Sequence, residues 1–307
     1  MKGIVLAGGL GTRLHPATLV VNKQLLPVYD KPMIYYPLSV LMLAGIDEIL
    51  IVSSPDHLGN YRHLFGDGSS LGLSIAYLEQ RRPEGLPQAF TLARAWIAGE
   101  AVALILGDNI FYGNGLVELC LRAKARVSGP EGHSDGKPYG GATVFGYQVD
   151  DPQRYGVIGF DDQGRVTSLE EKPVMPRSTC AMTGLYFFDR RVCDLAAGLM
   201  PSARGELEIT DLAQRYLDTG ELYVEQMGRG YAWLDTGTHD SLLEASEFVR
   251  TIQRRQGIQI ACLEEIAYHQ GLISADQARH LAAGLDKSPY GAAILRAIEE
   301  RSAPPQD

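Results

Sequence analysis

The sequence has no long hydrophobic run, and only four of its 307 residues are cysteine. The apolar run at residues 4–7 is far too short for a membrane span or a signal peptide, so we expect a cytoplasmic protein without a membrane partner. No cysteine lies in a C-x-x-C pair or at metal-ligand spacing from a second cysteine or a histidine. We therefore expect buried free thiols at Cys120, Cys180, Cys193 and Cys262.

Basic residues are in the minority. The chain has 28 Lys and Arg against 37 Asp and Glu, which gives a formal net charge of −9 at pH 7. Proteins that bind nucleic acid usually carry a broad basic surface, so no nucleic-acid partner is expected. A few local cations or backbone amides can still form a positive pocket, and an anionic small molecule remains compatible with this composition.

Short apolar runs alternate with amphipathic segments over the first two-thirds of the chain. This pattern predicts an α/β fold built from strand–helix–strand units around a mostly parallel sheet. Residues 128–141 are rich in glycine, proline, serine and charge, and they predict an exposed loop. Strands are expected at residues 4–7, 48–53, 101–106, 142–149, 157–160, 165–169, 182–188 and 231–234, and helices at 33–44, 86–98 and 116–127.

Beyond Thr238 the pattern indicates helices only. A long amphipathic helix is expected at residues 241–256 and another at 290–301. Between them, Ser274 and Gln277 have the spacing of a capping box. We therefore predict an α/β domain at residues 1–240 and a helical region at 241–307 that packs on it.

A glycine-rich segment, Gly8-Gly9-Leu10-Gly11-Thr12-Arg13, follows the first predicted strand. Glycines let backbone amides approach phosphate oxygens closely. The segment lacks the Lys-Ser/Thr pair of a P-loop, and Leu14 stands where a dinucleotide fingerprint needs glycine, which disfavours an NAD-dependent dehydrogenase. A plain tight turn is the alternative for this segment alone. Lys23 weakens that alternative, because Arg13 and Lys23 together could neutralise a triphosphate, although a lone lysine is more often solvated.

Residues 7–14, followed by Pro16, Thr18, Lys23 and Pro27, resemble the signature of the sugar-nucleotide pyrophosphorylases, a family of nucleotidyltransferases. The resemblance continues in order and at compatible spacing through residues 30–37, 106–109, 154–157, 169–173, 204–211 and 231–237. It implies a Rossmann-like, mostly parallel mixed sheet of the nucleotide-diphospho-sugar transferase type, with sugar-binding insertions within residues 1–240.

The resemblance also implies an activity. It implies magnesium-dependent transfer of a thymidylyl group from dTTP to glucose 1-phosphate by in-line displacement at the α-phosphorus, giving dTDP-glucose and pyrophosphate. Uridylyl transfer from UTP is the nearest alternative, and a non-catalytic sugar-nucleotide sensor on the same fold is another. The implied catalytic residues, whose presence disfavours a sensor, are Arg13, Asp108, Lys172 and Asp235. The implied nucleotide-binding residues are Gly8, Gly9, Gly11, Thr12, Arg13, Lys23, Gln24, Gln80, Gly85 and Asp108.

Two aspartates each end an apolar run. Asp108 follows the strand predicted at residues 101–106, and Asp235 follows the one at 231–234. Ligands of open α/β sheets bind beyond the carboxyl ends of the strands. Each aspartate could instead cap a turn or helix. The resemblance implies that both bind Mg²⁺, which takes its other ligands from phosphate and water.

The charged segment Glu170-Glu171-Lys172-Pro173 reads from composition as a solvated run. Strand alternation would place Glu171 opposite Glu170 and Lys172, although a bend at Pro173 could disturb this. The resemblance implies that Glu171 binds sugar hydroxyls and that Lys172 binds the sugar phosphate. The full implied sugar-phosphate site comprises Tyr155, Gly156, Glu171, Lys172, Met182 and Arg204.

The resemblance assigns Gln80 and Gly85 to the nucleotide base. An amide side chain can pair with the N3–H and carbonyl edge of a pyrimidine. Arg81, Arg82 and Pro87 depart from the smaller neutral residues usual in the family. Thymine differs from uracil by one methyl group, worth about 1 kcal/mol, so the choice between dTTP and UTP stays open.

The resemblance further implies a homotetramer and a second, regulatory nucleotide site near residues 260–269. Val117 and His269 replace a usual histidine and arginine of that site. Both changes remove or weaken a donor for phosphate. We therefore expect feedback inhibition by dTDP-rhamnose to be weak or absent.

Overall fold

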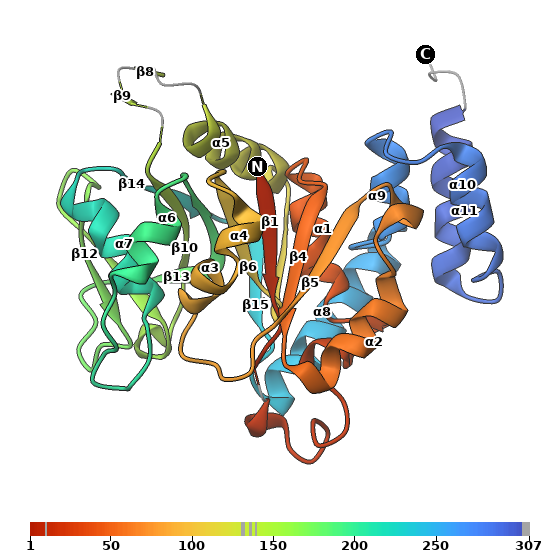
Figure 1. Ribbon diagram of the computed structural model, residues 1–307. Coiled ribbons are helices and arrows are strands. Elements are labelled where there is room, and N and C mark those ends of the chain that lie inside the picture. Colours follow the sequence, from red (N-terminus) through yellow and green to blue (C-terminus); the bar gives the residue numbers. More distant parts are fainter. Residues whose placement is uncertain (10, 130–132, 135–136, 139, 303–307) are drawn as a thin grey trace.

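The computed structural model describes residues 1–9, 11–129, 133–134, 137–138 and 140–302. Within them, a nine-stranded sheet runs through the centre in the order β12-β11-β13-β6-β1-β4-β5, and β10 and β14 extend it from β13 (Figure 1). Its strands are β1 (Lys2–Leu6), β4 (Glu48–Ser53), β5 (Ser74–Glu79), β6 (Val102–Leu106), β10 (Ala142–Gln148), β11 (Gly156–Phe160), β12 (Val166–Glu171), β13 (Cys180–Phe188) and β14 (Leu222–Met227).

The sheet has a parallel half and a mixed half. β1 pairs in parallel with β4 and β6, and β4 with β5. β13 runs antiparallel to β6, β10 and β11, and β11 and β12 form an antiparallel hairpin. The expectation of a mixed, mostly parallel α/β sheet flanked by helices is confirmed. The strands expected at residues 157–160 and 165–169 are present and form this hairpin.

Side-chain alternation assigns the strands to two faces. In β1, Val5 points into one hydrophobic cluster, whereas Ile4 and Leu6 point into the other. Both faces are covered, which is why these strands read as continuous apolar runs in the sequence. One face packs on α1 (Tyr35–Leu43) and α5 (Leu116–Ser128). The other packs on α3 (Gln88–Leu92), α4 (Arg94–Ile97), α6 (Val192–Ala197) and α7 (Ile209–Asp218).

Several predicted helices differ in detail. The prediction of a single helix at residues 86–98 is wrong, because a turn at Ala93 divides this segment into α3 and α4. Helix α1 ends before Gly45, whose φ of 65° suits glycine. The sequence analysis missed helices α2 (Pro55–Phe65) and α7 and strands β5 and β14.

The chain after Thr238 is helical in the part that the structure describes, as expected. It forms α8 (His239–Gln256), α9 (Leu263–His269), α10 (Ala275–Ala283) and α11 (Pro289–Ser302). Both hydrogen bonds of the predicted Ser274–Gln277 capping box are present. Residues of α9, α10 and α11 share a hydrophobic cluster with α1, so this region packs on the α/β domain (Figure 1). A domain boundary at residue 240 stays a prediction.

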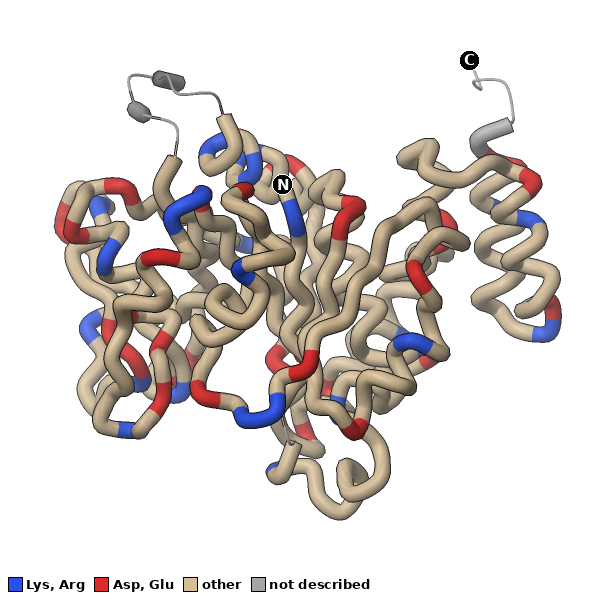
Figure 2. Tube along the Cα trace, viewed as in Figure 1, with Lys and Arg blue, Asp and Glu red and all other residues tan. Residues whose placement is uncertain are grey.

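The segment at residues 128–141 differs from its prediction. Residues 128–141 were expected as a loop, but β8 (His133–Ser134) and β9 (Lys137–Pro138) pair within them, and residues 130–132, 135–136 and 139 lie outside the described part. All four cysteines are buried and free. Charges of both signs are interspersed in the view of Figure 2. Among the described residues, no helix is long and apolar enough to cross a membrane.

Candidate active site

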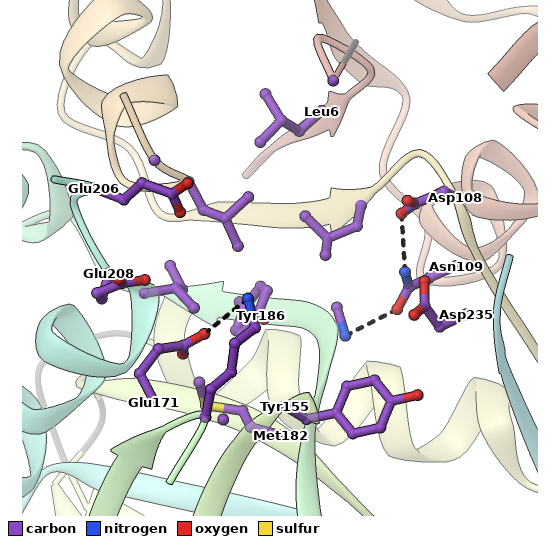
Figure 3. A pocket seen from close by; sticks show the side chains of 18 of the residues that line it. Leu6, Asp108, Asn109, Tyr155, Glu171, Met182, Tyr186, Glu206, Glu208 and Asp235 are labelled. Carbon is purple, nitrogen blue, oxygen red and sulfur yellow. Dashed lines mark hydrogen bonds and ion pairs between the residues drawn. The ribbon is translucent and has the colours of Figure 1, made fainter. Parts of the chain in front are cut away.

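A cavity of about 650 Å³ opens beyond the carboxyl ends of β1 and β6. Leu6, Gly9 and Leu106 line its floor on that side. β11 and β13 form the facing wall together with the segment at residues 206–209 (Figure 3). The cavity therefore lies where ligands bind in open α/β sheets. Eleven predicted site residues line it: Gly9, Arg13, Gln80, Gly85, Asp108, Tyr155, Gly156, Glu171, Lys172, Met182 and Asp235.

The glycine-rich segment turns tightly after β1. A Cβ at Gly8 would lie 2.2 Å from Oε1 of Gln80, so a larger residue there would displace the Gln80 amide. Gly11 has a φ of 60° and precedes a 3₁₀ turn, Thr12–Leu14, that carries Arg13 into the cavity. Gly8, Gly11 and Thr12 shape this turn but do not line the cavity, and Leu10 lies outside the described residues.

Strand register brings the two aspartates together. β7 (Asn109–Gly113) pairs antiparallel with β15 (Tyr231–Asp235), and Asn109 is the direct partner of Asp235. Asp108 is thereby beside Asp235, and Figure 3 shows the two carboxylates flanking Asn109. Burial, and then the charge of Asp108, raise the pKa of Asp235. The two carboxylates therefore repel each other, and the nearby cations Lys23, Arg13 and Arg154 offset this repulsion only in part.

Asn109 orients this pair and was missed in the sequence analysis. Its Nδ2 donates to Oδ1 of Asp108 at 3.0 Å. Its Oδ1 accepts from the Gly184 amide at 3.1 Å and from Nε1 of Trp233 at 2.7 Å. The quoted segment 106–109 contains Asn109, but only the β7–β15 register indicates its role.

The donor set suits a hard divalent cation. Asp108 and Asp235 supply carboxylate oxygens, the ligands that Mg²⁺ prefers. No group of three or more His, Cys, Asp or Glu able to hold a metal exists in the described part of the chain. A cation at the two aspartates would therefore take its remaining ligands from substrate phosphate and water.

Lys23 and Gln24 are buried next to each other in a 3₁₀ turn, Lys23–Leu25, and Lys23 reaches Asp108. Lys23 is 5% exposed, and its Nζ lies 2.5 Å from Oδ2 of Asp108. The general expectation that a lone lysine is solvated is therefore wrong for Lys23. Gln24 is also buried, and its Oε1 has no hydrogen-bond partner among the described residues. Neither residue lines the cavity in the free protein.

Strand β12 ends at the sugar-facing wall of the cavity. Glu170 pairs with Arg177 at 2.9 Å outside the cavity, whereas Glu171 lines it, as alternation predicts. Alternation is wrong for Lys172, which lines the cavity beside Glu171. Its φ of 44° breaks the strand pattern, and its amide donates to the Tyr155 carbonyl at 3.0 Å. A left-handed backbone at a non-glycine residue is costly and is often found at functional sites.

Arg204 differs from its expected position. It does not line the cavity but lies among three carboxylates, 3.2 Å from Glu171, 3.2 Å from Glu206 and 3.4 Å from Glu208. Glu206 and Glu208 do line the cavity and were missed, although segment 204–211 contains both. Burial raises the pKa of Glu171. Figure 3 shows Glu171, Glu206 and Glu208 on the sugar-facing wall, and Arg204 offsets their negative charge.

The base-facing end is built around Gln80 and Gly85. Nε2 of Gln80 donates to Oε1 of Gln88 at 2.7 Å, which fixes the direction of the buried Gln80 amide. Gly85 has a φ of 115° and forms an isolated bridge with Leu207. These contacts join the two walls of the cavity.

Gly85→Ala is expected to destabilise this junction strongly. An added Cβ would lie 2.0 Å from the Leu207 carbonyl oxygen, on a backbone that is itself strained for alanine. Chemical denaturation should show a loss of about 3 kcal/mol in the free energy of unfolding. The control is Gly220→Ala, where φ is 72° and nothing lies within 4 Å, so only about 1 kcal/mol should be lost. Equal losses would contradict the steric argument.

Comparison with known proteins agrees with this architecture. Residues 2–252 match the nucleotidyl transferase family, and the chain belongs to that family. It is 56% identical over 302 residues to the glucose-1-phosphate thymidylyltransferase of Xanthomonas campestris pv. campestris (strain B100), covering 98% of each chain. It is 52% identical over 300 residues to the enzyme of that name from Neisseria meningitidis serogroup A, covering 98% of this chain and 100% of the relative.

Solved structures show the same fold. A Bacillus anthracis protein assigned as a glucose-1-phosphate thymidylyltransferase, in complex with a sucrose, superposes with a TM-score of 0.71 at 39% identity. The match covers 81% of this chain and 95% of that one. A UDP-glucose pyrophosphorylase complexed with UDP-glucose gives a TM-score of 0.68 at 22% identity, over 81% of this chain and 98% of that one.

Proposed function

We propose that the protein transfers a thymidylyl group from dTTP to glucose 1-phosphate, forming dTDP-glucose and releasing pyrophosphate, with Mg²⁺ as cofactor. The observation that carries the proposal is that the β7–β15 register, which pairs Asn109 with Asp235, brings Asp108 and Asp235 into one cavity. Arg13 lines one end of that cavity, and Lys23 is paired there with Asp108. Glu171 and Lys172 stand at the other. The nucleotidyl transferase match and the names of the full-length relatives support the same reaction.

Both substrates are anions, so the site must offset their repulsion and align them. Mg²⁺ held by the two aspartates would neutralise phosphate charge and make the α-phosphorus more electrophilic. Lys172 would bind the sugar phosphate, and Glu171 would accept hydrogen bonds from sugar hydroxyls. Arg13 would stabilise the charge that develops on the leaving pyrophosphate, with Lys23 assisting. The sugar phosphate is already ionised at neutral pH, so no general base is assigned.

The remaining predicted residues keep their proposed roles. Tyr155, Gly156 and Met182 would contact the sugar. Arg204 would leave the three glutamates that surround it and bind the sugar phosphate. The nucleotide would be held by Gly8, Gly9, Gly11, Thr12, Gln24, Gln80 and Gly85.

The test is pyrophosphate release with Mg²⁺, a panel of nucleoside triphosphates and several sugar 1-phosphates. We expect glucose 1-phosphate with dTTP to be used best. A single methyl group is worth about 1 kcal/mol, so dTTP should exceed UTP in kcat/KM by about fivefold. Equal use of both donors in direct competition would make the protein a broader pyrimidine nucleotidyltransferase. No pyrophosphate release with any pair would favour a sensor.

The assembly and setting are also proposed. The protein would act in the cytoplasm, as a step toward dTDP-rhamnose, and as a homotetramer. Analytical ultracentrifugation would test this, and a monomeric sedimentation coefficient would contradict it.

Weak feedback inhibition is the expected consequence of two residues. Val117 lies in the first turn of α5 and cannot donate a hydrogen bond, and His269 ends α9 where the family has a stronger phosphate donor. Wild-type initial rates should therefore change little with dTDP-rhamnose at concentrations near the KM for dTTP. Adding Val117→His and His269→Arg together should create inhibition. Strong wild-type inhibition that is noncompetitive with both substrates would contradict the expectation.

A further inference from the structure

Arg154 lines the cavity at the junction of its two halves and has no role in the proposed mechanism so far. It ends a 3₁₀ turn, Pro152–Arg154, that is separated from β11 only by Tyr155. Nη1 donates to Oδ2 of Asp151 at 2.7 Å, and Nη2 lies 3.9 Å from Oδ2 of Asp235. The guanidinium also lies over the Tyr155 ring, 5.3 Å from its centroid.

The two aspartates thus each have a cation in the free protein. Lys23 pairs with Asp108 at 2.5 Å, and Arg154 lies within ion-pair distance of Asp235. These contacts partly neutralise two carboxylates that repel one another. A divalent cation held by both carboxylates would take over that neutralisation, and its positive charge would then repel the guanidinium.

The surroundings indicate where the released guanidinium binds. The next residues, Tyr155 and Gly156, line the sugar-facing wall, and the Tyr155 carbonyl accepts from the Lys172 amide. Arg154 therefore stands between the metal-binding carboxylates and the lysine proposed to hold the sugar phosphate. A guanidinium can bind two phosphoryl oxygens at once, which an ammonium cannot do with the same geometry.

We propose that Arg154 exchanges partners during the reaction: it neutralises Asp235 in the free enzyme and binds the phosphoryl oxygens of the sugar 1-phosphate once the carboxylates hold a divalent cation. This inference rests on the proposed function and adds a phosphate-binding residue to it. It also gives the sugar phosphate a second cation that already faces the cavity, whereas Arg204 is held among three glutamates.

The decisive variant is Arg154→Met, which keeps much of the side-chain length but removes the charge. The variant should bind Mn²⁺ more tightly and use glucose 1-phosphate with a higher KM. The affinity of the nucleotide-free protein for Mn²⁺ should rise about threefold or more, because a competing positive charge is gone. The electron paramagnetic resonance signal of free Mn²⁺ measures this affinity. The KM for glucose 1-phosphate should rise about tenfold or more, while the KM for dTTP stays within about threefold. A variant that had lost its structure would instead bind both Mn²⁺ and glucose 1-phosphate more weakly.

Two further variants sharpen the test. Arg154→Lys keeps the charge, so it should restore wild-type Mn²⁺ affinity but only part of the sugar-phosphate affinity. Asp151→Asn removes the partner of Arg154 outside the cavity and should leave both quantities within about twofold of wild type. Unchanged or weaker Mn²⁺ binding in Arg154→Met, or an unchanged KM for glucose 1-phosphate, would overturn the inference while wild-type turnover upholds the proposed function. If the wild type makes no dTDP-glucose, the proposed function itself fails.

Discussion

Asp235→Asn is expected to lower pyrophosphate release by about a thousandfold while leaving the protein at least as stable as the wild type. The activity falls because one of two carboxylates proposed to hold Mg²⁺ becomes neutral and keeps only a weak amide ligand. The stability does not fall, because the asparagine removes the repulsion between Asp108 and a carboxylate that burial disfavours. Steady-state assays with dTTP and glucose 1-phosphate, and chemical denaturation at pH 7, measure the two effects.

The pH dependence of this stability difference gives an independent check. The folded-state pKa of Asp235 is raised above its unfolded value, so ionisation of this carboxyl destabilises the folded state. The advantage of Asp235→Asn should be full at pH 7, shrink as the pH falls through the folded-state pKa, and vanish below the unfolded pKa of about 4. A variant that loses both activity and stability would mean that Asp235 is a structural residue.

The sequence alone predicts the site residues whose position depends only on the neighbouring residues along the chain. Asp108 follows an uninterrupted apolar strand, and strand ends of an α/β sheet face the ligand, so its place in the cavity could be predicted. The same holds for Gly9 and Arg13 after β1. Packing of the strands between two helical layers is likewise predictable, since the hydrophobic pattern itself requires burial on both faces.

Contacts between distant segments could not be predicted in this way. The role of Asn109 depends on the register of β7 with β15, which no local pattern fixes. Lys23 is buried because the turn after β1 folds it under Asp108, although lysine is usually exposed. Lys172 reaches the cavity through a positive φ that strand alternation does not anticipate. Each of these exceptions lies at the site, where local preference gives way to function.

Arg204 shows how motif resemblance and geometry differ. The resemblance implied contact with a phosphate, whereas the free protein places the guanidinium among Glu171, Glu206 and Glu208. Three carboxylates without that cation would repel both one another and an anionic substrate. Arg204 therefore has a structural task in the free state, in addition to any contact made with substrate.

Arg13→Ala is expected to reduce kcat by about two to three orders of magnitude, with little change in the free energy of unfolding. Arg13 is exposed at the cavity, and its guanidinium lies beside Gly237, so its removal opens no hole in the core. The loss should fall mainly on kcat, because the charge on pyrophosphate grows as the bond to the α-phosphorus breaks. Arg13→Lys should recover part of the rate. The matched control is Arg177→Ala, which removes an exposed arginine paired with Glu170 outside the cavity and should stay within about twofold of wild type. Wild-type kcat in Arg13→Ala would show that the developing charge is stabilised elsewhere, most directly by Lys23, the cation already bound to Asp108.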